Sequence, residues 1–198
     1  GFWPLRGLVP FPSRGWPFAP EHGLISRPSR AEPAPVSEKP DPIQLADDTA
    51  RTLARALLRQ ADHAALSFRD PADGLPGISR IAFGLTQDGV PITLVSSLAA
   101  HVPALRAEPA CAIMVAETAE KGDPLTHARL MIKARAEFVA QDAPDRAALR
   151  DDWLRGHPKS KLYIDFADFC FVRFRPTAVL LNAGFGKAFR LQCTDLTG

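Results

Sequence analysis

The segment from Arg129 to Phe138 alternates between apolar residues and residues that are mostly charged. A period of two residues is that of a β-strand, because successive side chains point to opposite faces of a sheet. A strand with one apolar face and one charged face is typical of an antiparallel sheet that has one side in water. The apolar members are Leu130, Ile132, Ala134, Ala136 and Phe138.

A β-hairpin is predicted upstream of this strand. Residues 78–85 are rich in apolar side chains, Asp88-Gly89 is a strong turn signal, and residues 91–96 favour extended backbone. Short connections favour antiparallel neighbours, so we expect an α+β domain around a small closed or nearly closed β-barrel. Further strands are predicted over residues 64–68, 110–117, 169–174, 177–181 and 188–193.

Two helices are expected before the alternating strand. Asp47 or Asp48 can cap a helix over residues 49–60, which carries apolar residues at helical spacing. A second, short helix follows the hairpin, with Pro103 in its first turn and Pro109 beyond its end.

A third helix is expected over residues 144–155. Asp142 is its predicted N-cap, and Gly156 follows its end. Its predicted packing residues are Ala147, Leu149 and Trp153.

The first 42 residues contain 10 of the 19 prolines. Frequent proline removes backbone donors and prevents helices and central strands. We therefore predict a disordered arm over residues 1–42 and a folded domain over residues 43–198. Scattered aromatic residues in the arm leave a second possibility open, in which the arm docks on its own domain or on a partner subunit.

Charge and cysteine content exclude several classes of protein. A net charge of +2 gives no signature of a nucleic-acid or membrane partner. No apolar run reaches the ~18 residues of a membrane span. The three cysteines form no CxxC pair, which suits a reducing compartment, and we expect a cytoplasmic location.

Familiar catalytic and metal-binding motifs are missing from the sequence. It has no P-loop, no HExxH and no GxSxG, and its five histidines show no metal-ligand spacing. No residue is therefore assigned a catalytic role, and no metal site is expected.

Arg80, Ser96 and Ser97 form a candidate anion site. The two serines end one hairpin strand just before a helix N-terminus, and Arg80 lies on the other strand. A guanidinium, two hydroxyls and free helix-end amides suit a phosphate monoester. The alternative is that Arg80 is a solvated strand residue and the serines cap the helix.

Four sequence blocks together resemble the pyridoxamine 5'-phosphate oxidase-like superfamily, and more narrowly its haem-utilisation branch. The blocks are SRIAFGLTQDGVPITLVSSLAAHVPALRAEPACAIMV, KGDPLTHARLMIKARAEFV, HPKSKLYIDFADFCFVRFRP and NAGFGKAF. The resemblance implies an FMN-binding split β-barrel, usually a homodimer with two flavin sites at the subunit interface. It implies that the FMN phosphate is held by Arg80, Ser96 and Ser97, with Arg129 as a second basic position and Ser79, His101 and Thr126 as further contacts.

This sequence departs from the family pattern at three positions. Val102 and Ala104 stand where Thr and Asn often follow the histidine, and Ala134 stands where a glycine is common. Because residues of the further C-terminal domain often found in the haem-utilisation branch are not in the sequence, haem is kept as a possible ligand only.

The resemblance implies an FMN-dependent oxidoreductase acting on a small molecule that the sequence does not identify. The flavin would carry the redox chemistry, and the protein would bind and orient it. The alternative is a non-catalytic flavin- or haem-binding protein of the haem-utilisation type. A third possibility is a structural homodimer whose ligand site has been lost.

Overall fold

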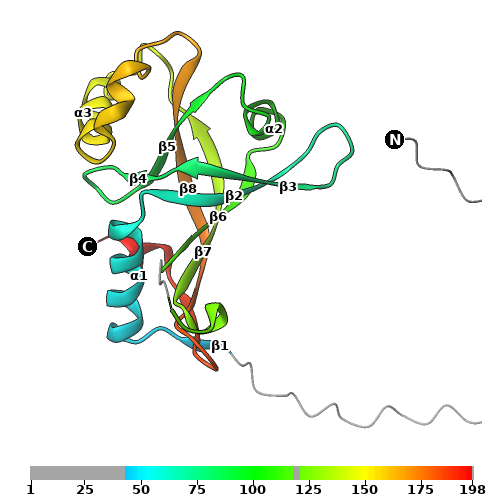
Figure 1. Cartoon of the computed structure of the whole chain (residues 1–198), viewed down its shortest axis with the longest axis vertical. Coiled ribbons are helices and arrows are strands. Elements are labelled where there is room, and N and C mark those ends of the chain that lie inside the picture. Colours follow the sequence, from blue (N-terminus) through cyan, green and yellow to red (C-terminus); the bar gives the residue numbers. More distant parts are fainter. Residues whose placement is uncertain (1–42, 118–120, 198) are drawn as a thin grey trace, which may run out of the picture. The chain divides into compact units, whose positions relative to one another are not determined.

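A computed structural model describes residues 43–117 and 121–197 (Figure 1). The predicted Pro-rich arm, residues 1–42, lies outside the described residues. The strands are β1 (Ile43–Leu45), β2 (His63–Arg69), β3 (Pro76–Ala82), β4 (Gly84–Leu85), β5 (Pro91–Ser96), β6 (Ala110–Ala116), β7 (Arg129–Phe138), β8 (Phe169–Asn182) and β9 (Ala188–Leu191). The helices are α1 (Asp48–Gln60), α2 (His101–Ala107) and α3 (Arg146–Gly156), with short 3-10 helices η1 (Pro124–Thr126), η2 (Pro158–Leu162) and η3 (Cys193–Leu196).

These strands form one sheet in the order β1-β9-β8-β7-β6-β2-β3, and β5 pairs with β8 and with β4. Every pairing except that of β1 with β9 is antiparallel. The Thr93 hydroxyl donates to Ala82 O at 2.6 Å, which joins β5 to the end of β3. The sheet thus curls into a split β-barrel, and the predicted α+β class is confirmed.

The alternation over Arg129–Phe138 is confirmed as β7. Leu130, Ile132, Ala134 and Ala136 are buried in the main core. Fully burying a side chain the size of Leu or Ile stabilises the fold by about 1.5–3 kcal/mol, so these inward residues fix the register of the strand. The opposite face of the strand is directed outward.

The predicted hairpin is only half correct. The Asp-Gly turn exists, with Gly89 at φ 77°, but it joins β5 to the two-residue β4. The longer first strand, β3, pairs with β2 instead. Phe83 causes the break, since its ring is fully buried and its N–H donates to Asp62 O at 2.8 Å.

Helix α1 agrees with the prediction, and the Asp47 side chain accepts a hydrogen bond from Ala50 N at 2.7 Å. Helix α3 begins later than predicted. Its N-cap is Asp145, so the expected capping by Asp142 is wrong. Pro144 precedes the helix and the chain turns through the Arg146 N–H to Ala143 O bond.

A second core cluster joins α3 to β5. Leu149 and Trp153 of α3 pack with Ile92 and Leu94 of β5, whereas Ala147 is exposed, contrary to the prediction. Figure 1 shows α3 beside β5 and α1 beside β6 and β7. Among the described residues, no helix has the length and apolar character needed to cross a bilayer.

Two predicted strands, 169–174 and 177–181, are one strand in the structure. β8 continues through Pro176, where the register with β7 shifts between Lys133 and Ala134. Proline lacks the N–H that a regular ladder needs, and this irregularity accommodates it. Strand β1 was not predicted, because its three residues are too few to show a period.

Candidate functional site

The outward face of the sheet carries a row of residues from successive strands. Arg80 on β3 lies opposite Ala65 on β2, which lies opposite Met114 on β6, which lies opposite Met131 on β7. Directly opposite residues share a face of the sheet. Ile78, two residues before Arg80, is 77% exposed and Met114 is 41% exposed. The face therefore presents apolar side chains to solvent, with a guanidinium at its edge.

A groove of about 790 Å³ is hollowed into this face beside the end of α1. It is lined by Leu57, Gln60, Ala61, Asp62, His63, Ala64, Ala65, Ile78, Ser79, Arg80, Met114, Ala116 and Glu117. The lining combines small or apolar side chains with the charged side chains of Asp62, Arg80 and Glu117. This combination suits a planar apolar molecule that carries anionic groups.

Arg80 and Ser79 both border the groove, but only the Arg80 side chain lies on its face of the sheet. Arg80 is exposed on the outward face. Ser79 borders the same groove but lies opposite the fully buried Leu66, so its side chain is directed to the other face. Arg80 is thus the predicted anion ligand that faces the groove directly.

Ser96 and Ser97 lie at the end of β5 and do not line this groove. The Ser96 hydroxyl donates to Asp168 Oδ2 at 2.6 Å and accepts from Leu98 N at 3.2 Å. The Ser97 N–H donates to Asp168 O at 2.7 Å. The Ser96 hydroxyl, which is predicted to bind a phosphate, is therefore already hydrogen-bonded to the Asp168 carboxylate.

His101 begins α2 and is buried. Its Nε2 has no hydrogen-bond partner among the residues that the structure describes. Burial lowers the pKa of His101, which keeps the ring neutral near pH 7. An unpartnered buried polar group costs about 1–3 kcal/mol, so a partner from a ligand or a second protomer would stabilise this corner.

Arg129 lies on the outward face, one strand away from the groove. It pairs across the ladder with Ala116, which lines the groove. Its Nη1 donates to Leu125 O at 3.3 Å and His127 O at 3.5 Å. Thr126, on η1, donates its hydroxyl to Asp123 O at 2.7 Å and does not line the groove.

The predicted ligand set is therefore divided among four places in the chain. Arg80 and Arg129 share the outward face, Ser96, Ser97 and His101 lie at the β5–α2 corner, and Thr126 lies on η1. Ser79 lies on β3 beside Arg80 but is directed to the other face. Sequence reasoning missed Asp62 and His63, which line the groove with Arg80. Their signal in the sequence is only an Asp-His dipeptide at a helix end, which is too common to indicate a site.

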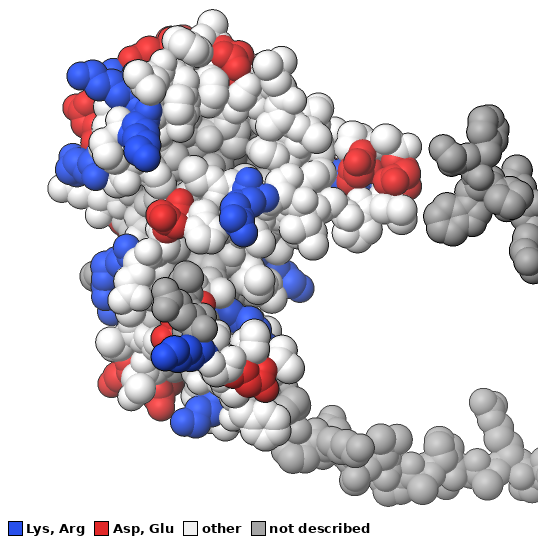
Figure 2. All heavy atoms as spheres, in the orientation of Figure 1, with Lys and Arg blue, Asp and Glu red and all other residues white. Residues whose placement is uncertain are grey.

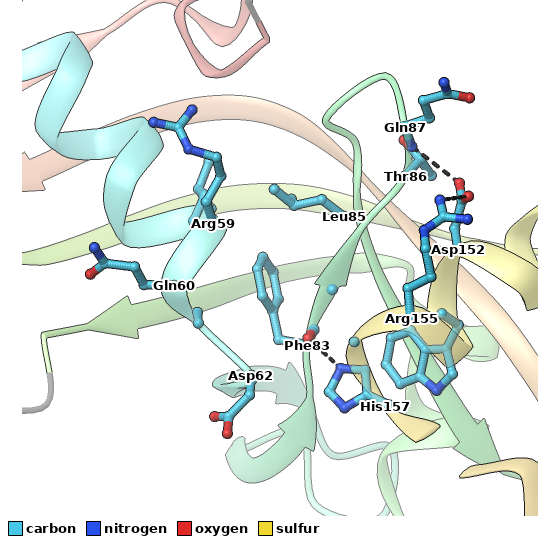
Figure 3. Close-up of a pocket in the computed structure, with 15 residues that line it drawn as sticks. Arg59, Gln60, Asp62, Phe83, Leu85, Thr86, Gln87, Asp152, Arg155 and His157 are labelled. Carbon is cyan, nitrogen blue, oxygen red and sulfur yellow. Dashed lines mark hydrogen bonds and ion pairs between the residues drawn. The ribbon is translucent and has the colours of Figure 1, made fainter. Parts of the chain in front are cut away.

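A second pocket of about 390 Å³ lies between the end of α1, the β3–β4 corner and α3 (Figure 3). His157 Nε2 donates to Phe83 O at 2.8 Å, and the His157 ring stacks on Trp153 at 4.2 Å. Arg155 pairs with Asp152. These side chains are held by a hydrogen bond, ring stacking and an ion pair within the protein, which favours a structural role for this pocket. It shares the α1–β2 connection, residues 60–62, with the groove.

The distribution of charged and metal-ligating side chains bears on which ligands the described residues could bind. Figure 2 shows both signs of charge interspersed on the face in view, without a patch of one sign. Among the described residues, no group of three or more His, Cys, Asp and Glu side chains is placed to hold a metal ion.

Comparisons with known proteins give related sequences and folds. A chloroplastic haem oxygenase of Arabidopsis thaliana, HOZ, is 36% identical over 123 residues, which are 62% of this chain and 36% of that protein. A solved structure with 45% identity has a TM-score of 0.70 and covers 78% of this chain and 99% of its own. A haem-binding protein of Mycobacterium smegmatis is 26% identical, with a TM-score of 0.68, over 77% of this chain and 61% of that chain. No family model matches the sequence.

The fold comparison reaches the pyridoxine phosphate oxidases. A Clostridium acetobutylicum protein of the pyridoxinephosphate oxidase family matches 76% of this chain and 99% of its own, with a TM-score of 0.59 and 17% identity. The chain therefore has the split-barrel fold of the pyridoxamine 5'-phosphate oxidase-like proteins. The resemblance stated from the sequence, including the similarity to haem-utilisation proteins, is confirmed.

This split-barrel protein spans about a third of the curated haem oxygenase and under two thirds of the mycobacterial haem-binding protein. The activities in their names are those of the whole relatives. A Mesorhizobium loti protein described as FAD-binding shares the same fold, with a TM-score of 0.54 and 14% identity. Proteins that share this fold are thus named for haem in one case and for a flavin in another.

Proposed function

We propose that this split-barrel protein binds haem in the groove beside Arg80. The observation that carries the proposal is the composition of the groove. Ala65, Ile78 and Met114 offer an apolar surface, and the Arg80 guanidinium stands next to it. Haem is a flat apolar ring with two carboxylates at one edge, so it needs apolar contact over its faces and a cation at that edge.

The relatives support haem as the first candidate ligand. Two of the relatives above 25% identity are named as a haem oxygenase and a haem-binding protein. When bound, haem supplies the redox chemistry of its iron, and the protein supplies binding, orientation and exclusion of water. Arg80 would pair with a carboxylate of the ring, and Met114 and Ile78 would pack on its face.

FMN is the second candidate, as cofactor of the oxidoreductase that the sequence resemblance implies. The observation in its favour is that Arg80 and Arg129 share the outward face and could meet a phosphate there. Ser79, Ser96, Ser97, His101 and Thr126 stay predicted FMN contacts. For Ser96 to bind phosphate, its hydroxyl would have to leave Asp168, and the two anions would repel each other.

A homodimer through the outward face would complete the site. The exposed side chains of Ile78 and Met114 would be covered by a second copy, as expected from the resemblance. An exposed apolar face on an antiparallel sheet is a typical surface for association. The groove lies on this same face, so each cofactor would be bordered by both protomers.

Titration of the purified full chain with haemin and, separately, with FMN tests the proposal. We expect haemin to give a saturable Soret band that stays with the protein through gel filtration. Retention of FMN and not haemin, seen as absorption near ~450 nm, would favour the flavin candidate. Retention of neither would contradict both.

A further inference from the structure

The side chain of His63 stands on the outward face of β2, at the end of the groove nearest α1. Its partner across the ladder is Ala82, while Arg80 pairs with Ala65 two residues along. His63 and Arg80 are therefore diagonal neighbours on one face of the sheet, roughly 7–8 Å apart. Both line the same groove.

Asp62 fixes which nitrogen of His63 is available. His63 Nδ1 lies 2.5 Å from Asp62 Oδ1. An ionised carboxylate has no proton to donate, so the ring nitrogen of His63 is the donor in this hydrogen bond. The proton of the neutral imidazole therefore sits on Nδ1, and Nε2 carries a lone pair.

The Nε2 side of the ring is open. The His63 side chain is 50% exposed, and no residue in the described part of the chain hydrogen-bonds to its Nε2. The neighbouring outward residues are alanines: Ala65 on the same strand, Ala82 on β3, and Ala116 two residues beyond Met114 on β6. Their short side chains leave space above the sheet beside the imidazole.

We propose that His63 would provide a nitrogen ligand to the iron of haem bound in this groove, with Asp62 as the positioning residue that holds the imidazole. This rests on the haem-binding function proposed above. Metal-ligating histidines almost always donate their second ring N–H to a carboxylate, carbonyl or water, which raises the basicity of the ligating nitrogen. The Asp62–His63 pair has that arrangement, and Glu117 is the other carboxylate of the groove.

The test compares ferric haemin complexes of the full-length wild type, His63→Ala, Asp62→Asn and His127→Ala by absorption and electron paramagnetic resonance. His127 is the matched control, because it lies on the turn after η1 and does not line the groove. We expect His63→Ala to shift the Soret maximum and change the iron spin state, with free imidazole restoring the wild-type spectrum. Asp62→Asn should keep the ligand but weaken haemin retention about 10-fold or more.

Two failures are distinguishable. If wild type retains haemin but His63→Ala has the same Soret band and spin state as wild type, the ligand assignment is overturned while haem binding stands. If wild type and every variant fail to retain haemin, the proposed function fails and the ligand assignment with it. Far-UV circular dichroism of each variant separates loss of the ligand from loss of the fold.

Discussion

The Phe68 ring lies directly over the backbone of Gly77, its cross-strand partner. A methyl group at Gly77 would come within 2.5 Å of Phe68 Cε2. Phe68 is buried in the main core, so the ring has little room to move. The glycine is therefore required by close packing between β2 and β3, at the edge of the sheet that carries the groove.

Replacing Gly77 with Ala should destabilise the domain by about 1–3 kcal/mol, since a methyl group would overpack the site. Urea unfolding followed by circular dichroism measures the change. Gly156→Ala is the matched control, because no atom lies within 4 Å of the added methyl group at this helical residue. Equal stability of the two variants would show that Phe68 moves aside without cost.

Arg80→Ala should weaken binding of FMN or haemin by about 1.5–3 kcal/mol, the range for hydrogen bonds to charged groups. Arg175→Ala, which removes an exposed arginine paired with Glu137 outside the groove, should leave the affinity unchanged. Equilibrium titration of each ligand gives the comparison. An unchanged affinity in Arg80→Ala would remove this residue from the site.

Met114→Lys should shift the proposed dimer toward monomer. A lysine at the centre of an apolar interface would bury an unpaired charge, which is strongly unfavourable. Ala140→Lys places the same charge at an exposed loop position as a control. Sedimentation velocity reports the oligomeric state, and a wild-type protein that is monomeric throughout would argue against this interface.

Stability should fall as the pH drops below about 6.5, because burial lowers the pKa of His101. The unfolded chain then binds a proton that the folded chain resists, so the native state is favoured above this pH and loses stability below it. Urea midpoints at about pH 7.5 and about pH 5.5 measure the loss. It should be smaller in His101→Leu and unchanged in His127→Leu.

Asp62 acts in a different pH range. Its pKa is lowered by the hydrogen bond from His63, so the stability it contributes is present above its unfolded value of 3.8 and is lost only at lower pH. A loss of folding stability centred below pH 3.8 would therefore indicate protonation of carboxylates such as Asp62, and not of His101.

The Cys111 thiol should react slowly with iodoacetamide. Burial raises its pKa from 9.0 to about 11, which lowers the thiolate population about 100-fold at neutral to mildly basic pH. Mass spectrometry of timed samples measures the rate in buffer and in urea. Similar rates in both would mean that the thiol is exposed in the native protein.

The sequence predicts this barrel where one strong local period decides the structure. Over Arg129–Phe138 the buried and exposed positions follow directly from the alternation. Pairing between strands that are distant in the sequence does not follow from such a local period. Nothing near Phe83 in the sequence indicates that its burial breaks the hairpin and sends β3 to β2.

The candidate site shows the same limit. The sequence predicts Arg80 as an anion ligand from its place on a hairpin strand, and in the structure Arg80 lines a groove. Nothing near Ser96 in the sequence indicates a partner for its hydroxyl, but in the structure the hydroxyl donates to Asp168, 72 positions away. Contacts over such distances depend on the closed fold, so neither the Asp168 contact nor the placement of His63 beside Arg80 follows from local patterns.

The parallel pairing of β1 with β9 joins Ile43 to Ala188, and Arg51 of α1 binds Asp195 at 3.0 Å. Both partners are synthesised near the end of the described chain. While the ribosome is still translating, β1 has no neighbour to pair with and α1 lacks this anchor. This edge can be completed only after β9 and Asp195 have left the ribosome, and slow translation before that point would prolong exposure of an unpaired strand.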